Sequence, residues 1–485
     1  MTIHLSIMLW LPAAAGALAV VAGRRFAGWV AFAGSLAALA YAVALLADFD
    51  SASGSLQYVT DDVWIGELGI HYKLGVDGLN LALLLLTTFA FTACLLWAAL
   101  EREHPPQFFM WLAIGHSAVL GALLAQDLLL FVLFFDLMLV PFFFLTGIWG
   151  GPDRVRAIVK LFIYTLVGSL LMLAGAIATG VIALPNEATT FALSDLQRAG
   201  FGEETQRWIF LCFAAAFLVK MPAFPLHGWM PDGYRNMPLP VLAVFSGVLS
   251  KVGVYGFLRI VVPLFPDAAF DFQTLMLLIA LASILYGSVM AFTTTDVRLI
   301  LGYSSVAQLG FITLGVFSIS DAGSQGAIFQ SVNHGLVVVP AFFIVGLLAA
   351  RAGGSEDLRD MGGTAFRAPV LAGLFLIVAL ATLAMPGSAN FLGEFLILYG
   401  VFETKIVIAI VAFTGVVLAS VYMLRMFIRS MHNRVREGVT PTDIRFADGL
   451  VLVPLVAVIL ALALYPQVLL DKAERTIHPE IQVIR

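Results

Sequence analysis

The chain has 485 residues and a formal net charge of -5, and only 12% of its residues are charged while 61% are hydrophobic. The charged share is about half of that in a soluble globular domain, and the chain lacks the basic field that binding to nucleic acid requires. The composition therefore excludes a soluble enzyme, a disordered chain and a nucleic-acid-binding protein. It indicates a polytopic membrane protein.

Apolar runs of about 20 residues, the length that a helix needs to cross a bilayer, recur along the whole chain. They predict an all-α, polytopic fold with about fourteen transmembrane helices. The predicted spans are 3–23, 27–48, 77–100, 107–125, 127–149, 157–184, 207–231, 238–262, 271–294, 298–317, 325–350, 368–402, 404–430 and 449–470. The first span is interpreted as a helix and not as a cleaved signal peptide, because its positive charges, Arg24 and Arg25, follow the apolar run.

Lysine and arginine are distributed unequally between the two sides of these spans, and loops rich in them normally face the cytoplasm. The loops after odd-numbered spans carry about twice as many as the opposite side with the C-terminal tail. We therefore expect a multi-pass protein of a cell's inner (plasma) membrane with both termini on the outer, periplasmic side. The basic residues of the predicted cytoplasmic side are Arg24, Arg25, Arg102, Arg154, Arg156, Lys160, Arg235, Arg298, Arg351, Arg359, Arg367, Arg425, Arg429, Arg434, Arg436 and Arg445.

The longest gaps between spans, 49–76 and 185–206, contain neither GxxxxGK[ST] nor GxGxxG, which argues against an ATP-driven pump. Cys94 and Cys212 lie in separate apolar runs and form no Cys-x-x-Cys motif, which argues against an iron–sulfur cluster or c-type haem. We expect no cofactor and no metal in this chain. Its energy source is then an ion gradient or partner subunits.

Four ionisable residues lie near the middle of predicted spans: Asp136, Lys220, Lys251 and Glu394. An ionised group at the centre of a membrane helix costs about 3 kcal/mol on insertion scales, so four of them cost roughly 12 kcal/mol, comparable with the stability of a domain. One interpretation is a set of static ion pairs between helices, although apolar packing would join helices at lower cost. The other is a chain of protonatable groups that face the bundle interior and reach water.

Histidines add groups that titrate near neutral pH. His334 lies well inside the span 325–350. His227 follows Lys220 by seven residues, which is two helical turns and the same face if the helix resumes after Pro222. Both are candidate proton-transfer residues. His116 is interpreted as a hydrogen-bonded packing residue, with a haem between His116 and His334 as the alternative.

Two predicted spans are interrupted by proline and small polar residues, in KMPAFPLHGWMP and in AMPGSANF. Backbone groups freed inside lipid need neighbours or a wet cavity, and matching breaks in two halves of a chain indicate inverted repeats with ion sites at the breaks. Lys220 precedes one break and Glu394 follows the other. The predicted units are N-terminal helices in 1–106, a first five-helix repeat in 107–262, a second, inverted five-helix repeat in 271–430, and a C-terminal helix with its tail in 449–485.

Six segments occur in a recognisable order: FFDLMLVPFFFLTGIWGG, KLFIYTLVGSLLML, FLVKMPAFPLHGWMPDGYRNMPLPVLAVFSGVLSKVGVYGFLR, DVRLILGYSSVAQLGF, NHGLVVVPAFFIVGLLAAR and GSANFLGEFLILYG. They resemble the antiporter-like proton-pumping subunits of respiratory complex I, the proton-translocating NADH:quinone oxidoreductase. The likeness extends from about residue 74 to about residue 430. Within that family, LVPFFFLTGIWGG and NFLGEF are similar to the M-type subunit, the homologue of mitochondrial subunit 4.

The resemblance implies a hydrated lateral row of proton-transfer groups, with half-channels at the two broken helices and no flavin, iron–sulfur cluster or quinone site in the chain itself. Its implied members are Asp136, Lys220, Lys251, His334 and Glu394. Asp136 stands where the family usually has glutamate, which leaves open whether it reaches Lys220 directly or through a water. Gln308 stands where many members have histidine, which weakens a relay through the span 298–317.

We therefore expect an enzyme subunit of NADH:quinone oxidoreductase that translocates protons while quinone is reduced elsewhere in the complex. The expected partners are neighbouring antiporter-like membrane subunits on both sides, lipids, protons and internal water. The alternatives are a subunit of a multisubunit cation/proton antiporter or of a membrane-bound hydrogenase, and a scaffold without ion conduction. RAGGSEDLRDMGG and 425–445 are interpreted as solvated loops, with lipid headgroups or a neighbouring subunit as alternative ligands.

Overall fold

The computed structural model describes residues 4–183, 189–436 and 438–482, with side chains as far as Glu474. The parts of the predicted spans and units that fall on residues 1–3, 184–188 and 483–485 lie outside the described residues. The described chain is nearly all helical, so the prediction of an all-α membrane protein is confirmed.

The elements follow one another along the chain as a long series of helices with one early hairpin. They are α1 (Leu5–Asp48), β1 (Gln57–Ile65), the 3-10 turn η1 (Gly66–Leu68), β2 (Ile70–Val76), α2 (Gly78–Glu101), α3 (Pro106–Leu124), α4 (Leu128–Leu137), α5 (Leu139–Trp149), α6 (Arg154–Ala183), α7 (Leu193–Leu196), α8 (Glu203–Lys220), α9 (Met230–Asn236), α10 (Leu239–Val244), the π-helical η2 (Phe245–Leu249), α11 (Ser250–Gly256), the π-helical η3 (Phe257–Val261), α12 (Val262–Leu264), α13 (Pro266–Asp271), α14 (Gln273–Thr293), α15 (Val297–Phe317), α16 (Asp321–Arg351), α17 (Pro369–Thr382), α18 (Ala389–Thr404), α19 (Ile406–Met431), α20 (Phe446–Leu464) and α21 (Gln467–Gln482).

Within the described residues, 11 helical segments are long and apolar enough to cross a membrane. The longest, α1, contains two predicted spans that meet at Gly23, whose φ of 75° lies in the left-handed region that glycine adopts without strain. Three further helices, α8, α17 and α18, overlap predicted spans but do not count among these segments. The total of about fourteen spans therefore stays a prediction.

A two-stranded antiparallel hairpin, β1 and β2, is absent from the sequence-based expectations. It is joined by a turn in which Gly69 has a left-handed φ of 67°. It packs against the α3–α4 connection, where the backbone N–H of Gln126 donates to the carbonyl of Lys73 and that of His71 donates to the carboxylate of Asp127. A search for apolar runs passes over these strands because β1 is largely exposed.

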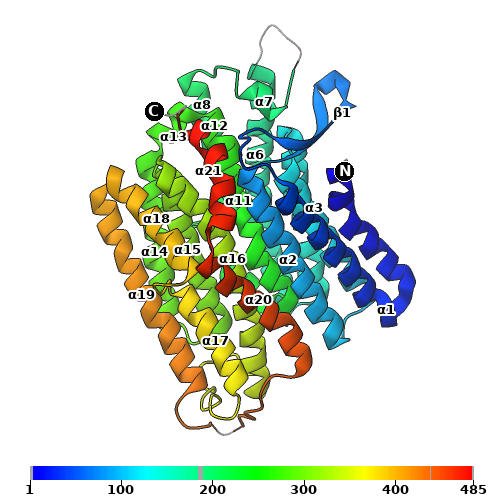
Figure 1. Cartoon of the computed structure of the whole chain (residues 1–485), viewed down its shortest axis with the longest axis vertical. Coiled ribbons are helices and arrows are strands. Elements are labelled where there is room, and N and C mark those ends of the chain that lie inside the picture. The colour runs from blue at the N-terminus through cyan, green and yellow to red at the C-terminus, as the bar shows by residue number, and fades with distance from the viewer. Residues whose placement is uncertain (1–3, 184–188, 437, 483–485) are drawn as a thin grey trace.

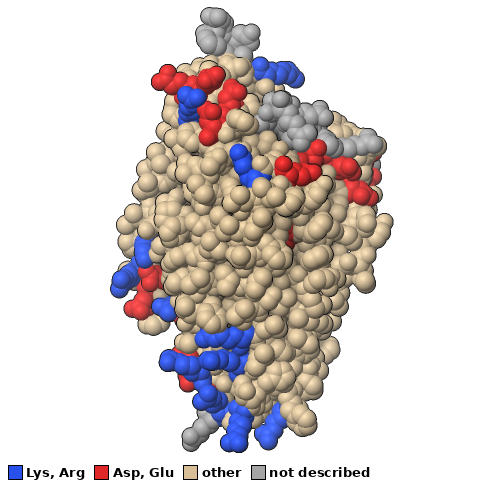
Figure 2. Space-filling view, turned by 90° about the vertical axis from the view of Figure 1, so that its left-hand side faces the viewer, with Lys and Arg blue, Asp and Glu red and all other residues tan. Residues whose placement is uncertain are grey.

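In Figure 1 the α1 helix and α19 lie at opposite edges of the bundle, with α2, α11 and α16 between them. The start of α1, the hairpin and the end of α21 lie at one end, here called the hairpin end (Figure 1). Figure 2 shows basic side chains gathered at the opposite end of the visible face, and acidic ones prominent at the hairpin end. We call that opposite end, where α2 ends and the α16–α17 loop lies, the basic end.

The central helices are buried along their apolar length. This holds for α15, for the α10–α12 segment and almost completely for α16. A helix that is apolar on all sides is buried either in protein or in lipid, and these three segments are enclosed by protein. These three segments carry Gln308, Lys251 and His334, so the fold places its polar residues at the centre of the bundle and away from lipid.

Both predicted helix breaks are present. Helix α8 ends at Lys220, and regular helix resumes only at Met230. Proline cannot supply the backbone donors that a continued helix needs. The freed carbonyl of Val219 instead accepts a hydrogen bond from the Trp229 indole at 3.0 Å. The second break separates α17 from α18, which begins with the Ser388 hydroxyl accepting from the N–H of Phe391.

Glycines allow α18 to approach α16 closely. A Cβ placed on Gly326 of α16 would lie 2.8 Å from the backbone nitrogen of Ile397 and 3.0 Å from the carbonyl oxygen of Gly393. Backbone atoms cannot move aside as a flexible side chain does. The position of α18, and therefore of Glu394, depends on the absence of a side chain at this contact.

We predict that Gly326→Val separates α16 from α18 and destabilises the protein by about 1–3 kcal/mol, the usual cost of overpacking. Gly373→Val is the matched control, because Gly373 is an exposed residue of α17 where an added Cβ would meet no atom within 4 Å. Thermal unfolding of both variants in the same detergent measures the difference. Equal unfolding temperatures for the two variants would contradict the proposed contact.

Candidate functional site

Asp136 and Lys220 lie close together but do not form a direct ion pair. Their charges interact, yet no nitrogen–oxygen contact within 4.0 Å joins them in the described chain. Ser169 of α6 lies next to the Asp136 carboxyl group, and the Lys220 Nζ lies 4.7 Å from the ring centroid of Phe135. Asp136, which stands in place of the family's usual glutamate, therefore does not reach Lys220 directly in this conformation.

The helix that carries Asp136 is interrupted directly after it. Helix α4 ends at Leu137 and α5 begins at Leu139. Pro141 has no N–H to donate to the carbonyl of Leu137, four residues earlier, which accounts for the discontinuity. Asp136 is only partly buried, and Leu133 and Val140 on the same helical face are exposed. Asp136 therefore lies near the side of the bundle.

Lys251 is held by neutral oxygen atoms. Its Nζ donates to the carbonyl of Ser246 at 2.8 Å and to the hydroxyl of Ser250 at 3.1 Å. The π-helical segment η2 ends two residues before it, and the wider turn of a π-helix rearranges the backbone acceptors of the preceding residues. Lys251 is 1% exposed, so these contacts replace water around its amine.

A series of hydrogen bonds leads from Gln330, near His334, to Glu394. Gln330 lies one helical turn before His334 on α16. Its Nε2 donates to the Gln308 Oε1 of α15 at 2.9 Å, and the Gln308 Nε2 donates to the Glu394 Oε1 of α18 at 2.8 Å. Gln308 is thus part of the site as an amide that binds the terminal acid.

Close backbone contacts join the remaining pairs of helices. A Cβ on Gly253, two residues after Lys251, would lie 3.2 Å from the carbonyl oxygen of Phe217 on α8. A Cβ on Gly335, next to His334, would lie 2.6 Å from the carbonyl oxygen of Gly247. His334 also lies within electrostatic range of Lys251. The helices that carry Lys220, Lys251 and His334 are therefore direct neighbours.

These residues form one arrangement across the bundle, here called the buried polar row. Its members are Asp136, Lys220, Lys251, His334, Gln330, Gln308 and Glu394. Static ion pairs between helices would require lysine–carboxylate contacts, and the described chain has none within 4.0 Å for either lysine or for Glu394. The ion-pair interpretation therefore does not describe this geometry.

Several atoms of the row have capacity for further hydrogen bonds. Among the described protein groups, neither ring nitrogen of His334 has a partner, nor has the Glu394 Oε2 or the Gln330 Oε1. Buried polar atoms are normally satisfied by protein or by ordered water. The row thus offers water several buried donors and acceptors at successive positions.

His227 does not share a helical face with Lys220, because α8 ends before it. The condition for a shared face, a helix that continues past Pro222, is therefore not met. His227 lies in the break, with its ring 4.8 Å from that of Tyr286 and stacked on Phe224 at 5.7 Å, and it interacts electrostatically with Lys160. Its part in proton transfer stays a prediction.

His116 packs as expected. Its ring is stacked on Phe91 at 4.6 Å and its Nδ1 lies 3.2 Å from the Ser35 hydroxyl. In the part of the chain that the structure describes, no three His, Cys, Asp or Glu side chains are grouped to hold a metal ion. The expectation of a chain without metal or cofactor stays a prediction.

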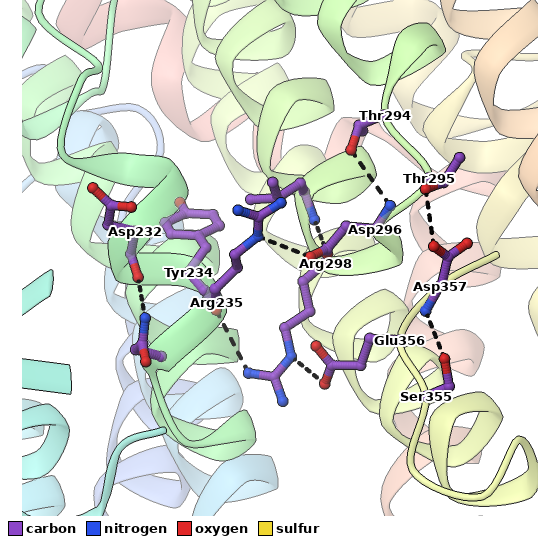
Figure 3. Close-up of polar contacts among 12 residues, drawn as sticks. Asp232, Tyr234, Arg235, Thr294, Thr295, Asp296, Arg298, Ser355, Glu356 and Asp357 are labelled. Carbon is purple, nitrogen blue, oxygen red and sulfur yellow. Dashed lines mark hydrogen bonds and ion pairs between the residues drawn. The ribbon is translucent and has the colours of Figure 1, made fainter. Parts of the chain in front are cut away.

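At the basic end, an ion-pair network anchors α9, the helix that follows the first break (Figure 3). The Arg298 guanidinium donates to the carbonyl of Met237 at 2.8 Å and pairs with Glu356 of the α16–α17 loop at 2.6 Å. Arg235 of α9 pairs with Asp296, whose carboxylate caps the start of α15. The first break is thereby fixed to the helices that carry Gln308 and His334.

Two carboxyl groups of this loop have altered acidity. Hydrogen bonds and the charge of Arg359 lower the pKa of Asp357 to about 2, so it remains ionised at physiological pH. Burial raises the pKa of Glu356, while the adjacent Arg298 opposes the rise. The ion pair of Arg298 with Glu356 is thus less exposed to solvent than the ion pair of Arg359 with Asp357.

Sequence reasoning missed several polar partners in the row. Gln330, Ser246, Ser250 and Ser169 each contact a predicted site residue or a partner of one. Gln330 lies four residues before His334 in an apolar span, a spacing that could have identified it. The two serines beside Lys251 are short polar residues in apolar helices, and nothing in the sequence marks them as amine ligands.

The chain matches known proteins over most of its length. Residues 125–419 match the family described as NADH:quinone oxidoreductase/Mrp antiporter, TM. It is 35% identical to NADH-quinone oxidoreductase subunit M of Rhodobacter capsulatus, over 96% of this chain and 94% of that protein. It is 34% identical to the subunit M of Mycobacterium tuberculosis, over 96% of this chain and 91% of that one.

Solved structures share the fold. A chain of respiratory complex I from Thermus thermophilus with bound NADH superimposes with a TM-score of 0.90 at 29% identity, over 100% of both chains. A chain of the Mrp complex from Dietzia sp. DQ12-45-1b gives 0.87 at 22% identity, also over 100% of both chains, which shows a common fold alone. The matched region covers more than half of the chain and the relatives cover nearly all of it, so the chain belongs to the NADH:quinone oxidoreductase/Mrp antiporter family of membrane subunits.

Proposed function

We propose that this chain is a proton-translocating membrane subunit of an NADH:quinone oxidoreductase, in which protons move along the buried polar row while quinone is reduced elsewhere in the complex. Relatives of this chain that share 34–35% identity with it are named as subunit M of that enzyme. Neighbouring membrane subunits, lipids and internal water are its partners, and it carries no redox centre of its own.

The observation that carries the proposal is that the buried ionisable groups are held by neutral partners. Lys251 binds serine oxygens, Glu394 binds the amide of Gln308, and Lys220 lies against an aromatic ring. A buried charge without a counter-ion is costly for a purely structural element. Such a group can gain or lose its proton without breaking an ion pair, and this favours proton transfer over a scaffold.

The separation of Asp136 from Lys220 controls proton loading in this proposal. At an effective dielectric of about 20, unit charges about 4 Å apart attract by roughly 4 kcal/mol, and charges about 7 Å apart by roughly 2.4 kcal/mol. The difference of about 1.6 kcal/mol changes a protonation equilibrium by more than tenfold. Movement of the Asp136 carboxylate between Ser169 and Lys220 would thus load or release the Lys220 proton. Because the row titrates as a coupled set, the proton passes on towards Lys251, His334 and Glu394.

The orientation proposed for the chain follows its charge. Loops rich in arginine face the cytoplasm in most multi-pass proteins, so the basic end faces the cytoplasm and both termini lie on the outer side of the inner membrane. The two helix breaks then provide the entry and exit of the row. Labelling of a cysteine added at the C-terminus, from outside intact spheroplasts, tests this orientation.

We expect the chain to co-purify with NADH- and quinone-binding subunits after extraction in mild detergent. The alternative is a subunit of a multisubunit cation/proton antiporter or of a membrane-bound hydrogenase. The chain of the Mrp complex shares the fold, which is compatible with the antiporter alternative. Mass spectrometry of the co-eluting proteins distinguishes them. Recovery of an antiporter set without NADH-binding subunits would overturn the assignment.

We predict that Asp136→Asn and Lys220→Ala each lower quinone-coupled proton pumping severalfold while the complex still assembles. The first removes the charge that tunes Lys220, and the second removes the proton acceptor. Asp136→Glu is the matched control and should pump normally, since it keeps the charge. Pumping in proteoliposomes, with NADH oxidation measured in parallel, gives the comparison. Normal pumping by assembled Lys220→Ala would reject the direct role.

Gln308→Leu should weaken both stability and pumping, because it leaves the Glu394 Oε1 without its amide donor. An unsatisfied buried acceptor costs about 1–3 kcal/mol. Gln308→His retains an N–H donor and should behave much more like the unaltered protein. Thermal unfolding and proton pumping of the two variants test the contact, and a Gln308→Leu protein as stable and active as the unaltered one would disprove its importance.

A further inference from the structure

A cavity of about 550 Å³ opens at the basic end, between the kink of α1 and the junction of α2 with α3. The left-handed turn at Gly23 places Arg24 and Arg25 on one side of it. Arg102, at the end of α2, and His104 lie on the other side. The close approach of these helices depends on Gly28, where a Cβ would lie 2.8 Å from that of Ala99.

Three guanidinium groups therefore surround one cavity without acidic partners. Arg24, Arg25 and Arg102 are exposed, and none has a carboxylate oxygen within 4.0 Å in the described residues. Arginines of the network in Figure 3 are paired, by contrast: Arg235 with Asp296 and Arg298 with Glu356. Like charges gathered around a cavity repel one another and attract an anion.

The acidic residues next to the cavity do not neutralise it. The Glu101 Oε1 accepts from the Trp97 indole at 2.7 Å, and its Oε2 lies 3.2 Å from the His104 Nε2. Glu103 is exposed and has no basic group within 4.0 Å in the described chain. The positive charge of the three arginines is thus available to a ligand from outside the chain.

The cavity also has an apolar, membrane-facing rim. Phe26 and Trp29 line it and are 54% and 40% exposed, and Arg25 lies over the Phe26 ring. The outer face of α1 continues from it with exposed Leu18 and Val21. Exposed aromatic rings at the end of a membrane helix are typical of the level of lipid headgroups. A ligand here would meet cations at one end and an apolar helix face at the other.

We propose that this cavity binds the headgroup of an anionic phospholipid, and specifically of a lipid with two phosphates such as diphosphatidylglycerol. Basic pockets between membrane helices suit anionic headgroups. Guanidinium groups bind phosphate with paired hydrogen bonds, and three of them match two phosphates better than one. The acyl chains lie along the exposed face of α1. The site lies apart from the buried polar row and does not depend on proton transfer.

The test compares lipid retention in two matched triple variants of the chain, extracted with its associated subunits in mild detergent. Arg24→Gln, Arg25→Gln and Arg102→Gln together remove the cations of the cavity. The control, Arg367→Gln, Arg434→Gln and Arg436→Gln, removes the same charge from exposed positions at the basic end outside it. Native mass spectrometry should find one diphosphatidylglycerol fewer on the cavity variant and none lost from the control.

Competition distinguishes the possible occupants. Phosphatidylglycerol vesicles and inorganic phosphate should displace the bound lipid much less effectively than diphosphatidylglycerol vesicles do. Displacement by inorganic phosphate would mean a free-anion site, and loss of a protein subunit from the cavity variant would mean a protein occupant; both overturn the proposal. So does equal lipid retention by the two variants.

A photoreactive diphosphatidylglycerol gives an independent result on the unaltered protein if the cavity variant fails to assemble. Its headgroup should label peptides that contain residues 24–29 or 102–109. Labelling that is absent from both peptides would overturn the proposal.

Discussion

The burial of ionisable side chains within an apolar helical bundle is the constraint on which the rest of this structure depends. A charge taken out of water needs compensation, and here it comes mainly from neutral groups: a backbone carbonyl and a hydroxyl for Lys251, an amide for Glu394 and an aromatic ring for Lys220. Neutral partners stabilise a charge without fixing it in place as a counter-ion would. The same arrangement that makes these groups tolerable therefore leaves their protonation free to change.

Irregular helix geometry accompanies most of these residues and supplies part of that compensation. Asp136 precedes the discontinuity between α4 and α5, Lys220 ends α8, Lys251 follows a π-helical segment, and Glu394 lies in α18 shortly after the second break. Each irregularity releases carbonyl or amide groups from the regular ladder, and in a membrane such groups are tolerated only inside protein or beside water. Regular central helices then fix the spacing between the irregular positions. Helix α15, for example, holds Gln308 between Gln330 of α16 and Glu394 of α18.

The sequence alone predicts the helical class, the positions of the breaks and the principal charged residues, because apolar runs, prolines and isolated charges are local signals. It does not predict where a broken helix resumes, so the expected shared face of His227 and Lys220 is removed by the early end of α8. The hairpin escapes prediction because β1 is mostly exposed and forms no apolar run. Gln330 escapes it because its role depends on Gln308, which lies on another helix. These features depend on tertiary partners that a local pattern does not contain.

Internal hydration is the property that tests the account most directly. High-resolution cryo-electron microscopy of the assembled complex in lipid, resolving ordered water, would show whether the gaps from Lys220 through Lys251 and His334 to Glu394 are wet. We expect density for waters hydrogen-bonded to the His334 ring nitrogens and to the Glu394 Oε2, linking successive members of the buried polar row. Dry, tightly packed apolar side chains between those members in every resolved conformation would contradict proton transfer along it.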